Sequence, residues 1–326
     1  MNKTPVCVII PNWNGKELLK DCLNSLRRQT YKKFQIIVVD NGSTDDSVQY
    51  VKKNFSEVIV IKLDKNYGFA KAINEGVRNS NADYVVFLNN DTYADKNWLK
   101  ELMAMADIHP EVISVGCKLL NYYRRKIIDG VGIMINEVGQ ARSLGYQEED
   151  QGQYDKVKYI FGATAGAALF KRSAFIKLGM FDENFFMYSE EVDFAFRAQF
   201  SGYKSIFCPK AMVYHKHKAS AEKLPQLIEY WQFRNMYQTI IKNFPIRVIL
   251  KKWRWLKIIL VYFNTIIYQM KLGFILPPVL VTVYLMVNLP RLIIQRYKIQ
   301  KSKQVSDQYI EGFLQQKRIT FWGLRK

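Results

Sequence analysis

The sequence predicts an α/β fold with a mostly parallel central sheet, covered by helices on both faces, and a basic helical extension after it. Over the first 110 residues, short apolar runs alternate with amphipathic segments, as in chains whose parallel strands are joined by helices. The runs are continuously apolar, which is typical of strands buried on both faces. Residues 204–326 hold 22 Lys+Arg and only 4 Asp+Glu, whereas residues 1–203 hold 26 and 25. We therefore expect an α/β domain over residues 1–225 and a helical extension over residues 226–326.

The individual elements follow from hydrophobic periodicity and capping signals. In the first part we expect strands at Val6–Pro11, Phe34–Asp40, Val58–Leu63 and Tyr84–Leu88, and helices at Lys16–Gln29, Thr44–Asn54 with Ser43 or Thr44 as its cap, Phe69–Asn79 and Lys96–Ile108. Further on we expect strands at Val112–Leu120 and Ile127–Ile135, a polar loop over Gly139–Tyr154, a helix near Ser189–Ser201, and strands at Ser205–Cys208 and Met212–Tyr214.

The four cysteines lie far apart, without a CxxC pair. They are expected to be reduced, packed thiols of a cytoplasmic protein, and this excludes a disulfide framework or a zinc site. A strand-like run begins directly after the first five residues, so no signal peptide is expected.

Polar segments directly follow three of the expected strands, at residues 12–15, 40–42 and 89–91. Ligands of parallel sheets bind beyond the carboxyl ends of the strands, so these segments predict a binding site. Asp91 there suits Mg²⁺ or Mn²⁺ bridging two phosphates, or alternatively caps a helix. Asp40 is placed to accept hydrogen bonds from a base or a ribose, or alternatively belongs to a turn.

Three acids lie within four residues at Glu190, Glu191 and Asp193, surrounded by aromatic side chains. Acids crowded in a partly buried segment have raised pKa values, so one of them is a candidate general base; the alternative is a solvated helix start. Arg197 lies four residues after Asp193 and is expected to pair with it. His215 is either structural or a metal or phosphate ligand.

Taken in order, these motifs resemble the family 2 glycosyltransferases, in particular their rhamnosyltransferase-like branch. The resemblance covers roughly residues 5–220. It rests on Pro11–Gly15, Val38–Asp45, Asn66–Ala70 with Asn74–Gly76, Leu88–Thr92, Gly166–Leu169, Phe181–Glu183 with Glu190–Arg197, and His215 with Ser220.

The resemblance implies a GT-A fold, a catalytic domain over residues 1–225, inversion at the anomeric carbon and a divalent metal, Mn²⁺ or Mg²⁺. Asp91 would be the metal-binding acid of a DxD-type motif in which Asn89 replaces the first acid, and His215 a further ligand. Glu191 stands where the family usually has the Asp of its base motif, and Glu190 is the alternative base, with Asp193 beside them. Residues expected to contact the nucleotide-sugar donor are Pro11, Trp13, Asn14, Asp40, Asn66, Gly68, Lys71, Asn89 and Asn90; those expected at the acceptor are Gly166, Ala167 and Arg197.

The basic extension favours an anionic membrane over nucleic acid. It contains 19 uncharged residues at 272–290, and Trp253 and Trp255 lie among lysines and arginines, as at a lipid interface. Pro277, Pro278 and Pro290 favour an interfacial or re-entrant segment over a single span at 272–290. The alternative is that these helices pack on the catalytic domain or on a second subunit. We expect a peripheral or monotopic protein on the cytoplasmic face, acting on a lipid-linked or glycan acceptor. The sequence does not indicate an oligomeric state.

The first expectation for the donor is dTDP-rhamnose, and the alternatives are UDP-galactofuranose, UDP-GlcNAc and UDP-glucose. Two other classes compete with an enzyme: a non-catalytic nucleotide-sugar-binding module and a nucleic-acid-binding protein. Donor hydrolysis separates the first from an enzyme, and binding to anionic liposomes versus DNA at matched salt separates the second.

Overall fold

The computed structural model describes residues 4–216 and 225–315. The chain forms two compact units: unit 1 comprises residues 1–133, 143–198 and 203–220, and unit 2 comprises residues 134–142, 199–202 and 221–326. Ser220, the last residue of the motifs above, lies outside the described residues.

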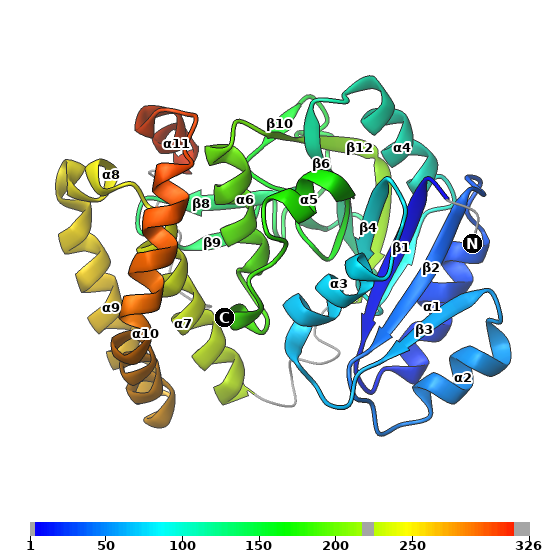
Figure 1. The fold of residues 1–326 in the computed structure, drawn as a ribbon, viewed down its shortest axis with the longest axis horizontal. Coiled ribbons are helices and arrows are strands. Elements are labelled where there is room, and N and C mark those ends of the chain that lie inside the picture. The colour runs from blue at the N-terminus through cyan, green and yellow to red at the C-terminus, as the bar shows by residue number, and fades with distance from the viewer. Residues whose placement is uncertain (1–3, 217–224, 316–326) are drawn as a thin grey trace. The chain divides into compact units, whose positions relative to one another are not determined.

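Unit 1 is an α/β domain whose strands and helices alternate along the chain (Figure 1). Its strands are β1 (Val6–Asn12), β2 (Phe34–Asp40), β3 (Val58–Lys62), β4 (Tyr84–Leu88), β5 (Thr92–Ala94), β6 (Val112–Asn121), β7 (Ile128–Gly130), β10 (Tyr159–Ile160), β11 (Ala167–Lys171) and β12 (Lys204–His215). Its helices are α1 (Lys16–Arg27), α2 (Ser47–Asn54), α3 (Gly68–Arg78), α4 (Trp98–Ile108), α5 (Arg172–Lys177) and most of α6 (Glu190–Phe200).

The strands form one sheet in the order β10-β12-β6-β11-β4-β1-β2-β3. Strands β3, β2, β1 and β4 are parallel, β11 is antiparallel to both its neighbours, and β6 and β12 are parallel to each other. The sheet is therefore mostly parallel, as predicted. Its order reverses between β1 and β4, and such a reversal opens a crevice at the carboxyl ends of the strands.

Alternate residues of β1 belong to two separate cores, one on each face of the sheet. Val8 and Ile10 pack with residues of α1, α2 and α4, whereas Cys7 and Ile9 pack with residues of α3, α5 and α6. Because both faces are covered, the strand carries no polar residue until Asn12. The four cysteines are free and buried, as predicted.

Four local predictions were wrong. The run Ile127–Ile135 is broken into β7 and β8 (Ile133–Asn136) around Gly132, whose φ is 141°. The loop expected at Gly139–Tyr154 contains β9 (Ala141–Ser143). The two strands expected after residue 204 are one strand, β12, with a register shift between Cys208 and Met212. Helix α2 begins at Ser47 after Asp46, because the Ser43 hydroxyl and the Thr44 backbone bond Asn14 instead of capping a helix.

Unit 2 is mostly helical. Its elements are α7 (Pro225–Asn243), α8 (Ile246–Leu250), α9 (Arg254–Lys271), α10 (Leu276–Lys301) and α11 (Asp307–Phe313), with a small sheet in the order β13-β8-β9, where β13 is Leu314–Gln315. Pro277 and Pro278 occupy the first turn of α10, where a missing N–H costs no hydrogen bond. Pro290 does not end the helix, which continues to Lys301. Among the described helices, α10 alone is long and apolar enough to cross a membrane, and 22% of its most apolar window is buried.

Candidate active site

Asn12, Asp40 and Asn90 meet where the order of the sheet reverses. Asn12 and Asp40 are register partners at the ends of β1 and β2, and both are buried. The Asn12 amide nitrogen lies 3.4 Å from Asp40 Oδ1, and Asn12 Oδ1 accepts a hydrogen bond of 2.8 Å from Asn90 Nδ2. One buried asparagine therefore ties together the ends of β1, β2 and β4 at the edge of the sheet where ligands of such folds bind.

The loop after β1 continues this site outward. Asn14 adopts a left-handed conformation, with φ at 48°, and its Oδ1 accepts the backbone N–H of Thr44 at 2.7 Å. Its own N–H donates to the Ser43 hydroxyl at 2.9 Å. These bonds turn the neighbouring Trp13 side chain toward solvent, with 37% of its surface exposed, while Pro11 is partly buried. An exposed indole beside the crevice offers a flat apolar surface to a ligand.

Asn41 and Asn66 brace the start of α3. Asn41 donates to Asn66 Oδ1 and to the Gly68 carbonyl, both at 3.0 Å, and Asn66 Oδ1 also accepts the Gly68 N–H at 2.9 Å. Gly68 has a φ of 85°, and a Cβ there would overlap the carbonyl of Phe186. The glycine therefore allows the backbone before α6 to touch the start of α3.

Lys71, expected at the donor, forms ion pairs with Glu75 at 2.9 Å and with Glu183 at 3.2 Å. Hydrogen bonds to both carboxylates raise the pKa of Lys71 despite partial desolvation. This side chain thus connects α3 to the segment that leads into α6.

The segment after β4 is anchored from several sides. The Asn89 N–H donates to the Gly166 carbonyl at 2.9 Å, and the Asn89 carbonyl accepts from the Thr92 hydroxyl at 2.6 Å. A Cβ on Gly166 would lie 3.3 Å from Asn89 Nδ2, so the glycine gives the amide room. Ala167, expected at the acceptor, is fully buried in the core between β4 and β6, which gives its side chain a packing role.

Asp91 and His215 come from distant parts of the chain and meet through strand pairing. Strand β5 begins one residue after Asp91 and pairs with β12 so that Thr92 lies opposite His215. As a result, His215 Nε2 lies 3.1 Å from Asp91 Oδ1, and its Nδ1 lies 2.6 Å from Asp129 Oδ2. Burial opposes the charge on His215, but the hydrogen bonds to Asp129 and Asp91 outweigh it and raise the His215 pKa to about 10.

Asp91 and His215 fit two neighbouring positions around a divalent cation. Asp91 Oδ1 and His215 Nε2 lie 3.1 Å apart, and carboxylate oxygen and imidazole nitrogen are both donors that a divalent cation such as Mn²⁺ would accept. Asp129 on the other ring nitrogen is the usual support of a metal-bound histidine. Within residues 4–216 and 225–315, no three His, Cys, Asp or Glu side chains converge on one point. A cation here would therefore complete its shell with donor phosphates and water, as Mg²⁺ commonly does.

Glu190 and Glu191 form a coupled pair of carboxyl groups at the start of α6. Burial, followed by the charge of Glu191, raises the pKa of Glu190 well above its usual range. Burial also raises the pKa of Glu191, while its backbone N–H and a hydrogen bond from Glu190 lower it in part. Glu190 is 4% exposed, whereas Glu191 is partly exposed. Glu190 is thus the buried member of the pair, and Glu191 is the more accessible one.

The loop that precedes this pair is strained and contacts the start of α3. Phe186, Tyr188 and Ser189 all have φ values between 64° and 70°, a conformation that costs a non-glycine residue about 1–2 kcal/mol. Phe186 touches Gly68, and four residues of chain reach at most about 14 Å, so Glu190 lies within that span of Phe186. Such strain persists where packing holds it, and here it orients the first turn of α6.

Asp193 and Arg197 pair as predicted, with 2.9 Å between Arg197 Nε and Asp193 Oδ2. Asp193 is fully buried, which separates it from the accessible Glu191. The other guanidinium nitrogens of Arg197 donate to the carbonyls of Leu178 and Met180, at 2.5 and 2.7 Å. Arg197, expected at the acceptor, thus fastens α6 to the loop before it.

Sequence reasoning missed Asn12 and Asp129 as site residues. Asn12 carried a usable signal, because it is the first polar side chain at the end of a strand buried on both faces. No sequence signal pointed to Asp129, because its position depends on the pairing of β7 with β6, and the expected strand Ile127–Ile135 is interrupted after β7.

Known proteins share both the sequence and the architecture of this chain. The O-antigen biosynthesis protein RfbC of Myxococcus xanthus is 26% identical over 238 residues, which cover 69% of this chain and 18% of RfbC. Thus the chain spans less than a fifth of that relative. The crystal structure of S. aureus TarS 1–349 in complex with UDP-GlcNAc matches with a TM-score of 0.54 and 19% identity, over 73% of this chain and 67% of that one.

The mannosyltransferase PcManGT from Pyrobaculum calidifontis, in complex with GDP-Man and Mn²⁺, matches with a TM-score of 0.55 and 15% identity, over 93% of this chain and 86% of that one. These likenesses show the GT-A fold. The glycosyl transferase family 2 model matches residues 7–179, more than half of the chain. This chain belongs to glycosyl transferase family 2.

Proposed function

We propose that this chain is an inverting hexosyltransferase, which moves a sugar from a nucleotide-diphosphate donor to a lipid-linked or polysaccharide acceptor in cell-surface glycan biosynthesis. The observation that carries the proposal is the meeting of Asp91 and His215 beside the polar network of Asn12, Asp40 and Asn90. That arrangement gives one crevice both a metal-ligand pair and hydrogen-bonding groups for a nucleotide. Family membership and the name of RfbC support the reaction class and the pathway.

Asp91 and His215 are proposed to hold the divalent cation, Mn²⁺ or Mg²⁺. A bound cation supplies positive charge that stabilises the departing diphosphate. Asp129 holds the His215 ring in place through Nδ1, so that Nε2 points to Asp91. A metal ligand of this kind must be a neutral imidazole, so His215 would hold the cation only in its unprotonated form.

The donor nucleotide is proposed to lie along the ends of β1, β2 and β4. Asp40 accepts a hydrogen bond from the base or ribose, with Pro11, Trp13 and Asn14 beside it, and Asn89 and Asn90 lie toward the diphosphate. Asn66, Gly68 and Lys71 are assigned a positioning role, because their polar groups hold α3 against the loop before α6. Gly166 positions Asn89, and no acceptor contact is proposed for Ala167 or Arg197.

Glu191 is proposed as the general base that takes the proton from the acceptor hydroxyl. Its raised pKa lies nearer to neutrality than that of an ordinary carboxylate, which favours proton transfer. Glu190 donates a hydrogen bond to it, so that one proton serves the buried pair. Asp193 pairs with Arg197 and fixes the helix that carries the base.

For the donor we propose dTDP-rhamnose first, with UDP-galactofuranose, UDP-GlcNAc and UDP-glucose as alternatives. The test incubates the purified chain with Mn²⁺ or Mg²⁺ and a panel of nucleotide sugars, and measures the released nucleoside diphosphate. Glu191→Gln is the control, because it should bind the donor and release nothing. Release only from UDP-hexoses contradicts rhamnose, and no release from any donor by a nucleotide-binding chain points to the non-catalytic module.

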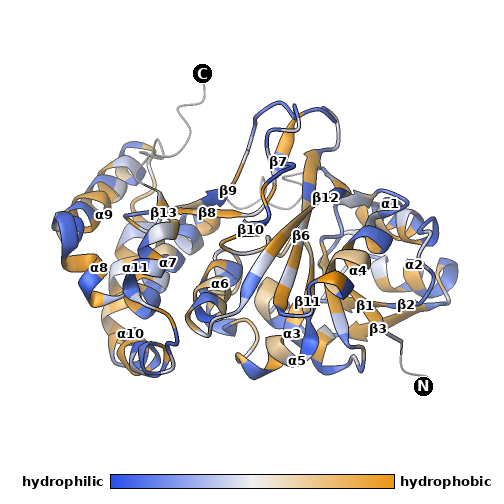
Figure 2. Ribbon diagram, turned by 90° about the horizontal axis from the view of Figure 1, so that it is seen from above, coloured by the Kyte–Doolittle hydropathy of each residue, from blue (hydrophilic) through white to orange (hydrophobic). Residues whose placement is uncertain are grey.

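We further propose that unit 2 attaches the protein to the cytoplasmic face of a membrane, as a peripheral or monotopic protein. The outer residues of α9 and α10 are apolar and exposed, among them Phe263 at 56%, Met286 at 71% and Val287 at 72%. Orange apolar residues recur along both helices in Figure 2. Soluble proteins rarely expose so large an apolar surface, and the surrounding lysines and arginines suit an anionic leaflet.

A further inference from the structure

In unit 2, helix α7 buries several polar residues, and helix α10 exposes several apolar ones. On α7, Arg234, Asn235, Gln238 and Lys242 are all buried. On α10, by contrast, Val283, Met286, Val287 and Ile294 are each more than half exposed. This reverses the usual pattern of soluble helices, and it is the arrangement expected where the outer surface meets lipid and the polar groups face inward.

Four of the inward-facing side chains form one cluster between α7 and α10. Tyr284 donates to Gln238 Oε1 at 2.8 Å, and Arg291 Nη2 donates to the Tyr284 hydroxyl at 2.8 Å and approaches Gln238 Oε1 at 3.5 Å. The guanidinium of Arg234, one turn before Gln238, lies 4.8 Å from the centre of the Tyr284 ring. Tyr284 thus lies between two guanidinium groups.

The unsatisfied atoms of this cluster are all donors. Arg291 Nε and Nη1 and Gln238 Nε2 are buried and have no hydrogen-bond partner among residues 4–216 and 225–315. Over the same residues, no carboxylate pairs with Arg291, whereas Lys251 and Arg254 of the same unit share Glu311. A buried cation and buried N–H groups are costly when unpaired, and an anion would satisfy them together.

We propose that this cluster, centred on Arg291 with Gln238 and Tyr284, binds a phosphate monoester on a membrane lipid, the head group that phosphatidic acid carries. The inference rests on the membrane association proposed above. Arg291 and Tyr284 keep partial exposure, whereas the unpaired Arg291 nitrogens are covered, so a phosphate at the Arg291 end would have to draw the guanidinium outward. The exposed apolar residues of the same helix, such as Met286 and Val287, would place that end at lipid depth, where the available anion is a lipid phosphate. The guanidinium fork binds such oxygens in two places at once.

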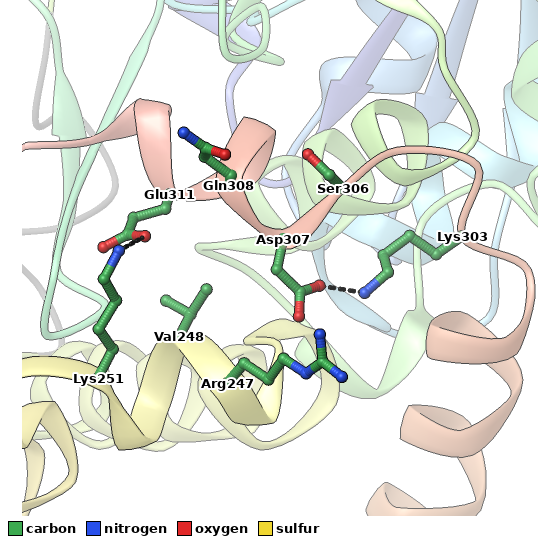
Figure 3. Close-up of a pocket in the computed structure, with 8 residues that line it drawn as sticks. All are labelled: Arg247, Val248, Lys251, Lys303, Ser306, Asp307, Gln308 and Glu311. Atoms are coloured by element: carbon green, nitrogen blue, oxygen red, sulfur yellow. Dashed lines mark hydrogen bonds and ion pairs between the residues drawn. The ribbon is translucent and has the colours of Figure 1, made fainter.

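A second arginine of unit 2 provides the contrast. Arg247 lines a cavity of about 760 Å³ together with Lys251, Lys303, Asp307 and Glu311 (Figure 3). There Lys251 pairs with Glu311 and Lys303 with Asp307, and Arg247 points toward the Asp307 carboxylate. The carboxylates of Asp307 and Glu311 already line this cavity, so Arg247 is an exposed basic residue that has no need of a phosphate. Arg247→Gln is therefore the matched control.

The experiment measures flotation of the full chain with phosphatidylcholine vesicles that contain either phosphatidic acid, a phosphate monoester, or phosphatidylglycerol, at equal surface charge. The ratio of the two affinities removes the general attraction to anionic lipid. We expect the wild type to prefer phosphatidic acid, and Arg291→Gln to lower the ratio about tenfold, as the loss of a charged hydrogen bond implies. Arg247→Gln should leave the ratio unchanged.

Several outcomes overturn the proposal. A wild-type affinity ratio near one would mean that the Arg291 cluster holds only structural water or free phosphate. Equal decreases of the ratio in Arg291→Gln and Arg247→Gln would mean that general electrostatic attraction causes the preference. If Arg291→Gln does not fold, Arg291→Lys keeps the charge without the fork and must lower the ratio in the same direction. If the chain floats with none of the vesicles, the proposed membrane association is contradicted. Donor hydrolysis by Arg291→Gln is expected at the wild-type rate, and it tests the activity of unit 1 independently of lipid binding.

Discussion

Gly68→Ala tests whether close contact between α3 and the loop before α6 is required for activity. At Gly68 the new methyl would meet two obstacles: a φ of 85° and the backbone carbonyl of Phe186. Gly179 is a matched control in the same unit, because its φ is 86° and, within the described chain, no neighbouring atom lies within 4 Å of a Cβ there. Only the contact with Phe186 distinguishes the two substitutions.

The left-handed conformation costs alanine about 1–2 kcal/mol, and this is the whole expected loss for Gly179→Ala. Gly68→Ala adds about 1–3 kcal/mol for overpacking, so its total is about 2–5 kcal/mol. The backbone at Phe186 must move to relieve the overlap, and a displacement of about 1 Å near a reacting group can cost about a hundredfold in rate.

Thermal unfolding followed by circular dichroism measures the two stability losses, and nucleoside diphosphate release measures the two rates. We expect Gly68→Ala to lose about a hundredfold in turnover while Gly179→Ala stays near the wild-type rate. Equal turnover in the two variants would refute the view that Gly68 positions the segment carrying Glu190 and Glu191.

Three further predictions concern the carboxyl pair, the metal ligands and the outer face of unit 2. The folded-state pKa of Glu190 is raised, so the native state binds more protons than the unfolded state and loses stability as the pH rises above about 4.5. Glu190→Gln should therefore be more stable than the wild type at neutral pH and equally stable in acid. In the same buffers, Glu191→Gln should release no product. Asp129→Asn should weaken Mn²⁺ affinity about 10–100-fold, measured by activation or calorimetry, with unchanged affinity contradicting its support of His215. Met286→Glu should abolish flotation with anionic vesicles, but Ile108→Glu should not, although both side chains are 71% exposed; equal behaviour would contradict a membrane-facing α10.

Most of unit 1 could be predicted because its strands are buried on both faces and end in polar residues. The continuous runs at Val6–Pro11 and Tyr84–Leu88 located the strands, and their ends located the crevice. Strand order was not readable, because it depends on contacts between residues far apart in sequence, such as β11 between β4 and β6. For the same reason the pairing of His215 with Thr92, which brings the histidine to Asp91, and the position of Asp129 appear only in the fold.

Unit 2 was harder to predict from periodicity. The prolines at 277 and 278 suggested an interrupted segment, but they begin a helix of 26 residues. Apolar residues lie on both the buried and the exposed sides of α10, for example Leu292 and Met286, so hydropathy alone did not indicate which face packs. The cluster around Arg291 could not be predicted, because it forms only where α10 packs against α7.

The most direct test is an anomalous diffraction measurement on crystals of this chain grown with Mn²⁺ and a nucleoside diphosphate. We predict one manganese peak bonded to Asp91 and His215, with the nucleotide along the ends of β1, β2 and β4 and the Glu191 carboxyl facing the same site. A manganese peak elsewhere, or a nucleotide bound away from these strand ends, would contradict this prediction.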